Sequence, residues 1–213
     1  MQMFEDWNFW VSIITAIVAI IAIILSVYQI RLSNKQHLFD RRLKAYMRVC
    51  ELYSLYQENA ASLSEKWDEP RLELDLEFMW LTNSFKMACY AEVIKKPLEE
   101  PFHQEFLKSL EELKCEAIEI EVIFNGKEAA TVSQFIMAYA DVLFSIYQYQ
   151  FLLYKIEQEN SKHPMTLEEA QEHFPEKEKR EKVKSSFEKL KATYSEMFTV
   201  KGNLKIKKQI ELK

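Results

Sequence analysis

The stretch WVSIITAIVAIIAIILSVYQI, residues 10–30, contains 21 consecutive residues without a charged side chain. At about 1.5 Å per residue, a helix of this length extends about 31 Å, enough to cross the hydrocarbon core of a bilayer. Trp7 and Trp10 stand at one end of the stretch and Tyr28 at the other, and such amphipathic rings prefer the membrane interfaces. The sequence therefore predicts a transmembrane helix at residues 9–30.

The charges on the two sides of this stretch differ in sign. Two acids and no base precede it, whereas residues 31–48 carry six basic residues against one acidic residue. Cytoplasmic flanks carry the excess of Lys and Arg, so residues 1–8 are expected to form a short external tail of a single-pass inner-membrane protein of a bacterium. A cleaved signal peptide is the competing interpretation. It requires a basic n-region and an apolar core shorter than the 21 residues found here, whereas this run follows two acids, so a retained anchor is favoured. The side chains expected at the membrane surface are Arg31, Lys35, Arg41, Arg42 and Lys44.

Glycine is scarce in this chain, with Gly126 and Gly202 the only two among 213 residues. Phosphate-binding loops, tight hairpins and dinucleotide-binding folds need glycine where the backbone turns sharply or approaches a ligand closely. We therefore expect an all-α protein, in which one N-terminal transmembrane helix continues into a cytoplasmic α-helical bundle. The bundle is assigned to residues 31–199 and a basic C-terminal tail to residues 200–213.

The charge of the chain beyond residue 48 is unevenly distributed. Residues 51–175 carry ten basic against 24 acidic side chains, and residues 176–213 carry twelve against six. The long acidic middle argues against broad nucleic-acid binding, which requires a cationic surface. The basic ends suit a surface of anionic lipid, although for the last helix alone a solvated helix face is the favoured explanation.

Cysteine usage fits a cytoplasmic domain. Cys50, Cys89 and Cys115 form no C-x-x-C pair, and thiols on the cytoplasmic side of a membrane stay reduced. We interpret all three as small core residues.

The residues that follow the span contain neither glycine nor proline up to residue 67 and keep a helical period. Five apolar residues at spacings of four and three predict the inward face of this exit helix: Phe39, Leu43, Tyr46, Cys50 and Tyr53. A further helix is favoured after Pro70, although the strict alternation of residues 71–78 leaves a short strand open.

Further helices follow from the same periodicity and from their end signals. A helix over residues 102–124 is predicted to stop at Asn125-Gly126, and Thr166 with Glu169 forms a capping box at the start of a short helix. A last, heavily charged helix carries five apolar residues on one side: Val183, Phe187, Leu190, Tyr194 and Met197. The residues beyond Gly202 are compatible with a strand, a membrane-surface segment or disorder.

The longest of these segments, residues 128–160, also allows a second membrane span. Between Glu128 and Lys155 its only charged residue is Asp141. Its several glutamine side chains favour the central helix of a bundle instead, because unpaired amides in lipid are costly.

No catalytic or metal-binding motif is complete. Four histidines lie in four separate segments: His37, His103, His163 and His173. None of them has a metal-ligand spacing such as H-E-x-x-H, so neither a metal nor a cofactor is expected.

One pair has the spacing of an enzyme motif. Arg31 and His37 match the Arg-then-His spacing of a widespread class of helical ribonucleases, which makes them the catalytic candidates of this chain. On a straight helix, however, two side chains six residues apart point about 120° away from each other. Arg31 is also the first charge after the span, where a basic residue is expected in any case. A membrane-tethered ribonuclease-like enzyme is therefore the alternative to a non-enzymatic function.

Small residues recur along the predicted span at alternating spacings of three and four, and we call them the small-residue seam: Ser12, Thr15, Ala19, Ala22 and Ser26. Small side chains let membrane helices approach closely, and a period of 3.5 residues implies left-handed packing. The same register holds polar residues on both sides of the span: Glu5, Asn8, Gln29, Ser33, Gln36 and Asp40.

This pattern predicts a homo-oligomer packed along the seam. With few chains the seam is a dry clamp that sets the number of subunits; with more chains it lines a pore. The clamp is favoured because no ring of charge lies within the span.

The run FDRRLKAY, residues 39–46, follows a single N-terminal span, and this layout resembles a set of uncharacterised bacterial inner-membrane proteins with helical cytoplasmic domains. Some proteins of this architecture are similar to membrane accessory proteins of antiviral systems, including pore-forming partners of RNA-guided nucleases. The resemblance covers about the first quarter of the chain. It implies a membrane-anchored interaction or effector module with an unidentified cytoplasmic protein partner, and pore formation in antiviral defence as one of its roles.

Overall fold

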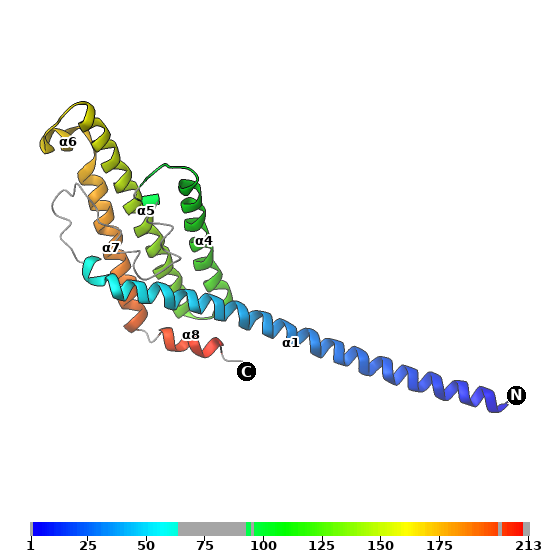
Figure 1. Cartoon of the computed structure of the whole chain (residues 1–213). Helices are drawn as coiled ribbons and strands as arrows, with labels where there is room; N and C mark the ends of the chain where they lie inside the picture. The colour runs from blue at the N-terminus through cyan, green and yellow to red at the C-terminus, as the bar shows by residue number, and fades with distance from the viewer. Residues whose placement is uncertain (1, 64–92, 95, 200–201, 211–213) are drawn as a thin grey trace.

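The computed structural model describes residues 2–63, 93–94, 96–199 and 202–210. These residues form six helices and no strand: α1 (Gln2–Leu63), α4 (Phe102–Ile123), α5 (Lys127–Lys162), α6 (Leu167–His173), α7 (Glu176–Thr199) and α8 (Gly202–Ile210). Figure 1 shows α4, α5 and α7 side by side as a bundle, which α1 crosses at one end. The predicted all-α class is therefore confirmed for the described part of the chain.

The expectations for the segment between α1 and α4 lie outside the described residues. They comprise the helix after Pro70, the alternative strand at residues 71–78 and the core position of Cys89.

α1 is one unbroken helix of 62 residues, which corresponds to a length of about 93 Å. Its apolar N-terminal half projects away from the bundle, and none of its most apolar 18 residues is buried (Figure 1). The helix begins at Gln2, so nearly all of the expected external tail, residues 1–8, is part of α1. An exposed apolar helix of this length can cross a membrane.

α5 is the second helix that is long and apolar enough to cross a membrane, yet 72% of its most apolar 18 residues are buried inside the structure. α4 packs along one side of α5 and α7 along another (Figure 1). The largest fully buried side chains of α5 are Phe135, Tyr139 and Tyr149. α5 thus occupies the place expected of the central helix of the bundle.

An aromatic cluster fastens the C-terminal turns of α1 to the bundle. Tyr56 of α1 lies with its ring centroid 4.0 Å from that of Tyr194 on α7 and 6.3 Å from that of Phe135 on α5. Tyr53 stacks on Tyr194 at 5.4 Å. Burial, helped by the hydrogen bond to Tyr194, raises the pKa of Tyr53 to about 12. The phenol therefore stays neutral at physiological pH, as a packed aromatic core requires.

The buried face of α1 overlaps the predicted face only in part. Val49, Leu52, Leu55 and Tyr56 are buried in the core. Ala45 packs against it partly buried, as do Tyr46 and Tyr53 of the predicted face. The prediction that Leu43 packs inward is wrong, because this side chain is 37% exposed. Leu43 lies two residues from Ala45, about 160° around the helix, so both cannot face the bundle.

The predicted helix ends are observed where capping residues specified them. α4 ends at Ile123, just before Asn125-Gly126. Gly126 adopts φ +96°, a conformation that L side chains rarely adopt, and so lets the chain turn into α5. At α6, the Thr166 hydroxyl accepts from the Glu169 amide at 3.2 Å, and the Glu169 carboxylate accepts from the Thr166 amide at 2.8 Å. The predicted capping box is confirmed.

Residues 202–210 form a helix packed on the bundle, so the strand and disorder alternatives for this segment are wrong. Ile206 of α8 is buried in the core, and Ile210, one turn later, is half-buried. The Gln209 side chain donates to the Asn125 carbonyl and accepts from the Asn125 amide, both at 2.8 Å. The assigned C-terminal tail therefore contains a docked helix.

The interpretation of the cysteines as core residues is wrong for Cys115, which is exposed, whereas Cys50 is half-buried. The buried face of α4 runs through Leu113, Ala117 and Ile120. Cys115 lies between two of these positions in sequence and therefore on the outer side of the helix.

Replacement of Phe135 by Ala is expected to destabilise the bundle by about 3–5 kcal/mol, since a fully buried ring that contacts three other rings is lost. Ile118→Ala on the exposed face of α4 is the control and is expected to change stability by less than about 0.5 kcal/mol. Denaturant titration of the detergent-solubilised full chain measures both. Equal effects of the two substitutions would contradict the packing described.

Candidate functional site at the junction of α1 with the bundle

The small-residue seam lies on the exposed half of α1, and two of its three hydroxyls bond to the backbone of the same helix. Ser12 Oγ donates to the Asn8 carbonyl at 2.9 Å, and Thr15 Oγ1 donates to the Val11 carbonyl at 2.8 Å. Since the helix backbone accepts both protons, these side chains need neither water nor a polar partner. At Ser12 and Thr15 the seam can therefore face lipid or a closely packed apolar helix.

Three polar side chains on the first turns of α1 after the apolar stretch are exposed: Arg31, Lys35 and His37. Arg31 and Lys35 lie within about 8 Å of the end of the stretch, a distance that matches the headgroup layer. The membrane-surface role of Arg31 and Lys35 stays a prediction.

Arg42 has a different environment, at about 18 Å beyond the apolar stretch. Its Nε donates to the Ile123 carbonyl at 2.7 Å, and its Nη1 donates to the Gln209 carbonyl at 2.9 Å. The guanidinium also lies 5.7 Å from the centroid of the Phe124 ring. Arg42 thereby joins α1 to the end of α4 and to α8, and we call these contacts the Arg42 junction.

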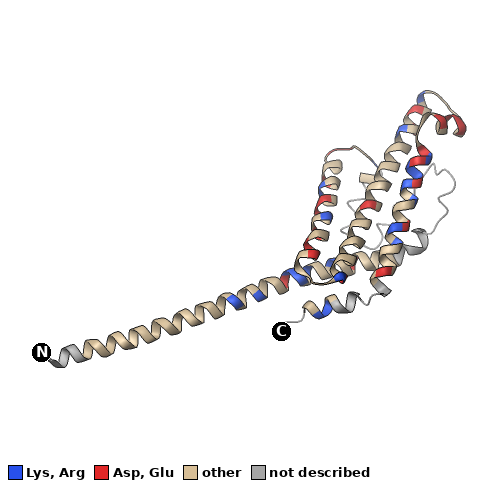
Figure 2. Ribbon diagram, turned by 180° about the vertical axis from the view of Figure 1, so that it is seen from behind, with Lys and Arg blue, Asp and Glu red and all other residues tan. Residues whose placement is uncertain are grey.

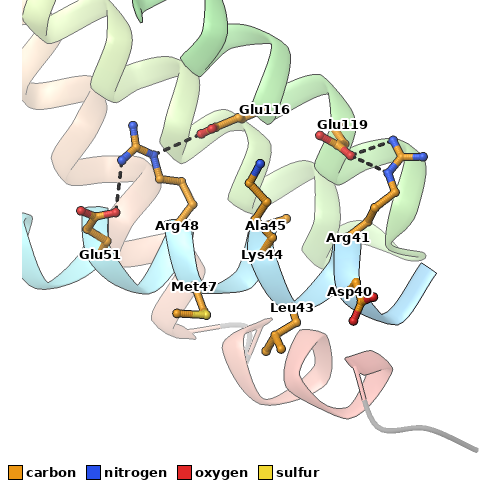
Figure 3. A pocket seen from close by; sticks show the side chains of 10 residues that line it. All are labelled: Asp40, Arg41, Leu43, Lys44, Ala45, Met47, Arg48, Glu51, Glu116 and Glu119. Atoms are coloured by element: carbon orange, nitrogen blue, oxygen red, sulfur yellow. Dashed lines mark hydrogen bonds and ion pairs between the residues drawn. The ribbon is translucent and has the colours of Figure 1, made fainter. Parts of the chain in front are cut away.

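Two further arginines of α1 reach sideways to α4. Arg41 pairs with Glu119 at 2.7 Å, and Arg48 pairs with Glu116 at 3.2 Å (Figure 3). Both carboxylates are substantially exposed, so each pair contributes about 0–1 kcal/mol. Of the five side chains predicted at the membrane surface, Arg41 and Arg42 therefore bind the bundle.

A groove of about 920 Å³ runs along α1 beside α4. Figure 3 shows Arg41 and Arg48 pointing toward α4, with Leu43 and Met47 on the opposite side of α1. Leu43 and Met47 are 37% and 64% exposed. Their apolar side chains and the charges around them suit the binding of a polypeptide surface rather than a small molecule.

Asp40 and Lys44 also line this groove. Within the described part of the chain, neither of them makes an ion pair. The groove therefore offers one acid and one base for a partner, four residues apart on the same helix.

The catalytic candidates are not brought together. Arg31 and His37 are both exposed on the unbroken helix α1, where six residues of separation point their side chains about 120° away from each other. Nor do His, Cys, Asp and Glu side chains gather in groups of three or more suited to a metal ion among the described residues. The geometry gives no support to a nuclease centre at Arg31 and His37.

Two polar clusters within the bundle were missed by sequence reasoning. Glu176 Oε1 accepts from the Tyr149 hydroxyl at 2.7 Å and from Arg180 Nε at 2.9 Å, with both charged side chains buried. Tyr147 shares a hydrogen bond of 2.7 Å with His103 Nδ1. Each cluster ties α5 to a neighbouring helix. The spacing of four between Glu176 and Arg180 was the one signal available in the sequence.

No protein-family model, curated protein or solved structure matches this chain. The resemblance of the FDRRLKAY stretch to other single-span proteins consequently stays a prediction. Function is inferred below from α1, the groove and the Arg42 junction.

Replacement of Arg42 by Gln is expected to loosen α8 and cost about 1.5–3 kcal/mol, because two charge-assisted hydrogen bonds to carbonyls are lost. Limited trypsin digestion of the full chain in detergent measures this as faster cleavage at Lys207 and Lys208. Arg41→Gln, which breaks only an exposed ion pair, is the matched control and is expected to leave cleavage unchanged. Identical digestion of the two variants would disprove the junction.

Proposed function

We propose that this protein is a single-pass inner-membrane protein that self-associates through its span and holds a helical interaction or effector module on the cytoplasmic side. The observation that carries the proposal is α1 itself. One unbroken helix contains an apolar stretch with no buried residue in its most apolar part and ends inside a packed bundle. Such an exposed apolar surface needs lipid or a protein partner to cover it.

Support for one span rather than two comes from the burial of α5. Moving α5 into lipid would expose its buried partners on α4 and α7 and break the hydrogen bond from Tyr149 to Glu176. The N-out orientation is supported by the basic excess after the span, which begins with the exposed Arg31 and Lys35.

Self-association is supported by the seam. Its five small residues hold a constant register on a helix side that the bundle does not cover. The bonded hydroxyls of Ser12 and Thr15 favour a dry clamp, because polar groups lining a water-filled lumen need no internal partner. A clamp of this kind brings bundles together and does no chemistry.

A reporter fused after Lys213 is expected to be active only when it reports the cytoplasm, because the basic excess follows the span. The paired measurement uses alkaline phosphatase, which is active only outside the cytoplasm, and a fluorescent protein that matures inside. Activity of the phosphatase fusion would overturn the orientation and the cytoplasmic assignment of the bundle.

Replacement of Ala19 or Ala22 by Leu is expected to dissociate the oligomer, since added bulk separates the backbones at the seam. Ile20→Leu keeps the volume of a side chain on a neighbouring face and serves as the control. Chemical crosslinking in native membranes gives the number of chains for each variant. A wild-type protein that crosslinks only as a monomer would remove the proposal of self-association.

Cells that overexpress the wild-type protein or the Ala19→Leu variant distinguish the clamp from a pore. A membrane-potential dye is expected to show no depolarisation during overexpression if the seam is dry. Depolarisation that Ala19→Leu abolishes would instead establish the pore-forming role that the resemblance implies.

A further inference from the structure

We propose that a second copy of this chain docks on the cytoplasmic part of α1, along Asp40, Leu43 and Met47. This docking face continues the small-residue seam beyond the membrane as one parallel helix–helix interface. The inference rests on the proposed self-association of the span and adds to it a surface, a partner and an orientation.

The register of the seam leads to this face. From Ser26, alternating steps of three and four residues pass through Gln29, Ser33 and Gln36 to Asp40, and then reach Leu43 and Met47. In this register, the polar residues are thus followed by two large apolar residues, Leu43 and Met47, where the bundle begins. A period of 3.5 residues sustained over this distance is the pattern of a left-handed pair of helices.

Among the residues that the structure describes, the bundle leaves this face open. Ala45, which packs against the core, lies two residues from both Leu43 and Met47, about 160° around the helix from each. α4 and α8 lie on opposite sides of α1 in both views of the chain (Figures 1 and 2). A partner helix therefore meets α1 between these two elements without a clash with the core of the bundle.

The orientation of the partner follows from the membrane. Two copies inserted with the same topology are related by an axis parallel to the span, so their α1 helices run parallel. A two-fold axis along the docking face then places α4 of one copy on the same side as α8 of the other.

The acid and the base of the docking face are complementary across such an axis. Asp40 and Lys44 line the groove, and within the described part of the chain neither of them makes an ion pair. Glu116 and Glu119 of α4, in contrast, already pair with Arg48 and Arg41 of their own chain. A second copy supplies a base for Asp40 and an acid for Lys44, which favours it over an unrelated partner.

The pairing of Asp40 with Lys44 of the other copy also removes a repulsion near the axis. In a parallel pair Asp40 meets its own copy near the axis, where two like charges repel, unless a base of the partner neutralises each of them. Lys44, one turn further along α1, has the reach to do so. The pairing of Asp40 with the partner's Lys44 fixes the register in which Leu43 and Met47 become covered.

Disulfide crosslinking of the full-length protein in native membranes tests the inference. In a background with Ser at Cys50, Cys89 and Cys115, Leu43→Cys and Met47→Cys are expected to form covalent dimers under mild oxidation. Leu38→Cys is the matched control, because Leu38 is 38% exposed, close to the 37% of Leu43, but points about 140° away from it. At least a five-fold higher dimer yield for Leu43→Cys than for Leu38→Cys is expected.

Ala19→Cys, a variant within the predicted span, distinguishes failure of this inference from failure of the proposed self-association. If Ala19→Cys forms dimers and neither Leu43→Cys nor Met47→Cys does, the chains associate only within the membrane and the docking face is disproved. Equal yields for Leu38→Cys and Leu43→Cys would disprove it as well. If none of the four variants forms dimers, self-association itself is refuted.

The charge pairing has its own readout in the Leu43→Cys protein. Lys44→Glu is expected to lower the dimer yield, since it adds a second acid beside Asp40, and the charge exchange of Asp40→Lys with Lys44→Glu is expected to restore it. Unchanged yields in all three proteins would overturn the proposed register.

Discussion

The backbone hydrogen bonds of α1 continue without interruption from the predicted membrane span into the bundle, and the rest of the structure depends on this continuity. A flexible linker at the membrane surface would let the span and the bundle rotate independently. Here α1 is one helix from Gln2 to Leu63, and its carbonyls, apart from those of the last turn, bond within the same helix. The direction in which the seam faces therefore fixes the direction in which the bundle faces, over about 93 Å of helix.

The bundle holds this helix at two places with different chemistry. The aromatic cluster of Tyr53, Tyr56 and Tyr194 covers its last turns by burial of large apolar surfaces. The Arg42 junction holds the point where α1 enters, and it does so through carbonyls left without helical partners at the ends of α4 and α8. Because the two places lie about four turns apart, α1 cannot pivot on the bundle.

Sequence reasoning succeeded where the periodicity was unambiguous. The buried face of α4 and the central position of α5 followed from apolar residues three and four apart, and Thr166 specified its cap. Between Phe39 and Tyr53, apolar residues surround much of the helix, so the sequence pattern allowed several faces of the helix to be the buried one. Only contacts with α4, α5 and α7 select Val49, Leu52 and Tyr56 over Leu43.

The junction was beyond local reasoning for a different reason. Arg42 was assigned to the membrane surface because a basic residue near a span usually lies there, and nothing nearby in sequence indicates Ile123 or Gln209 as its partners. These carbonyls lie 81 and 167 residues away along the chain. The docked α8 was missed together with it, since Ile206 and Ile210 fit a strand-like alternation as well as a helical face.

The open arc of α1 also bears on the proposed self-association, because it would limit the number of chains in the assembly. At the level of the bundle, Lys44, Asp40, Met47 and Leu43 span an arc of about 100° between α4 and α8. In a closed ring, each helix contacts two neighbours, and the angle between these contacts is about 60° for three chains and about 90° for four. Larger rings need contacts more than 100° apart, which α4 and α8 would obstruct. Continuity of α1 carries this limit into the span, so the placement of the bundle itself favours a narrow clamp over a wide pore.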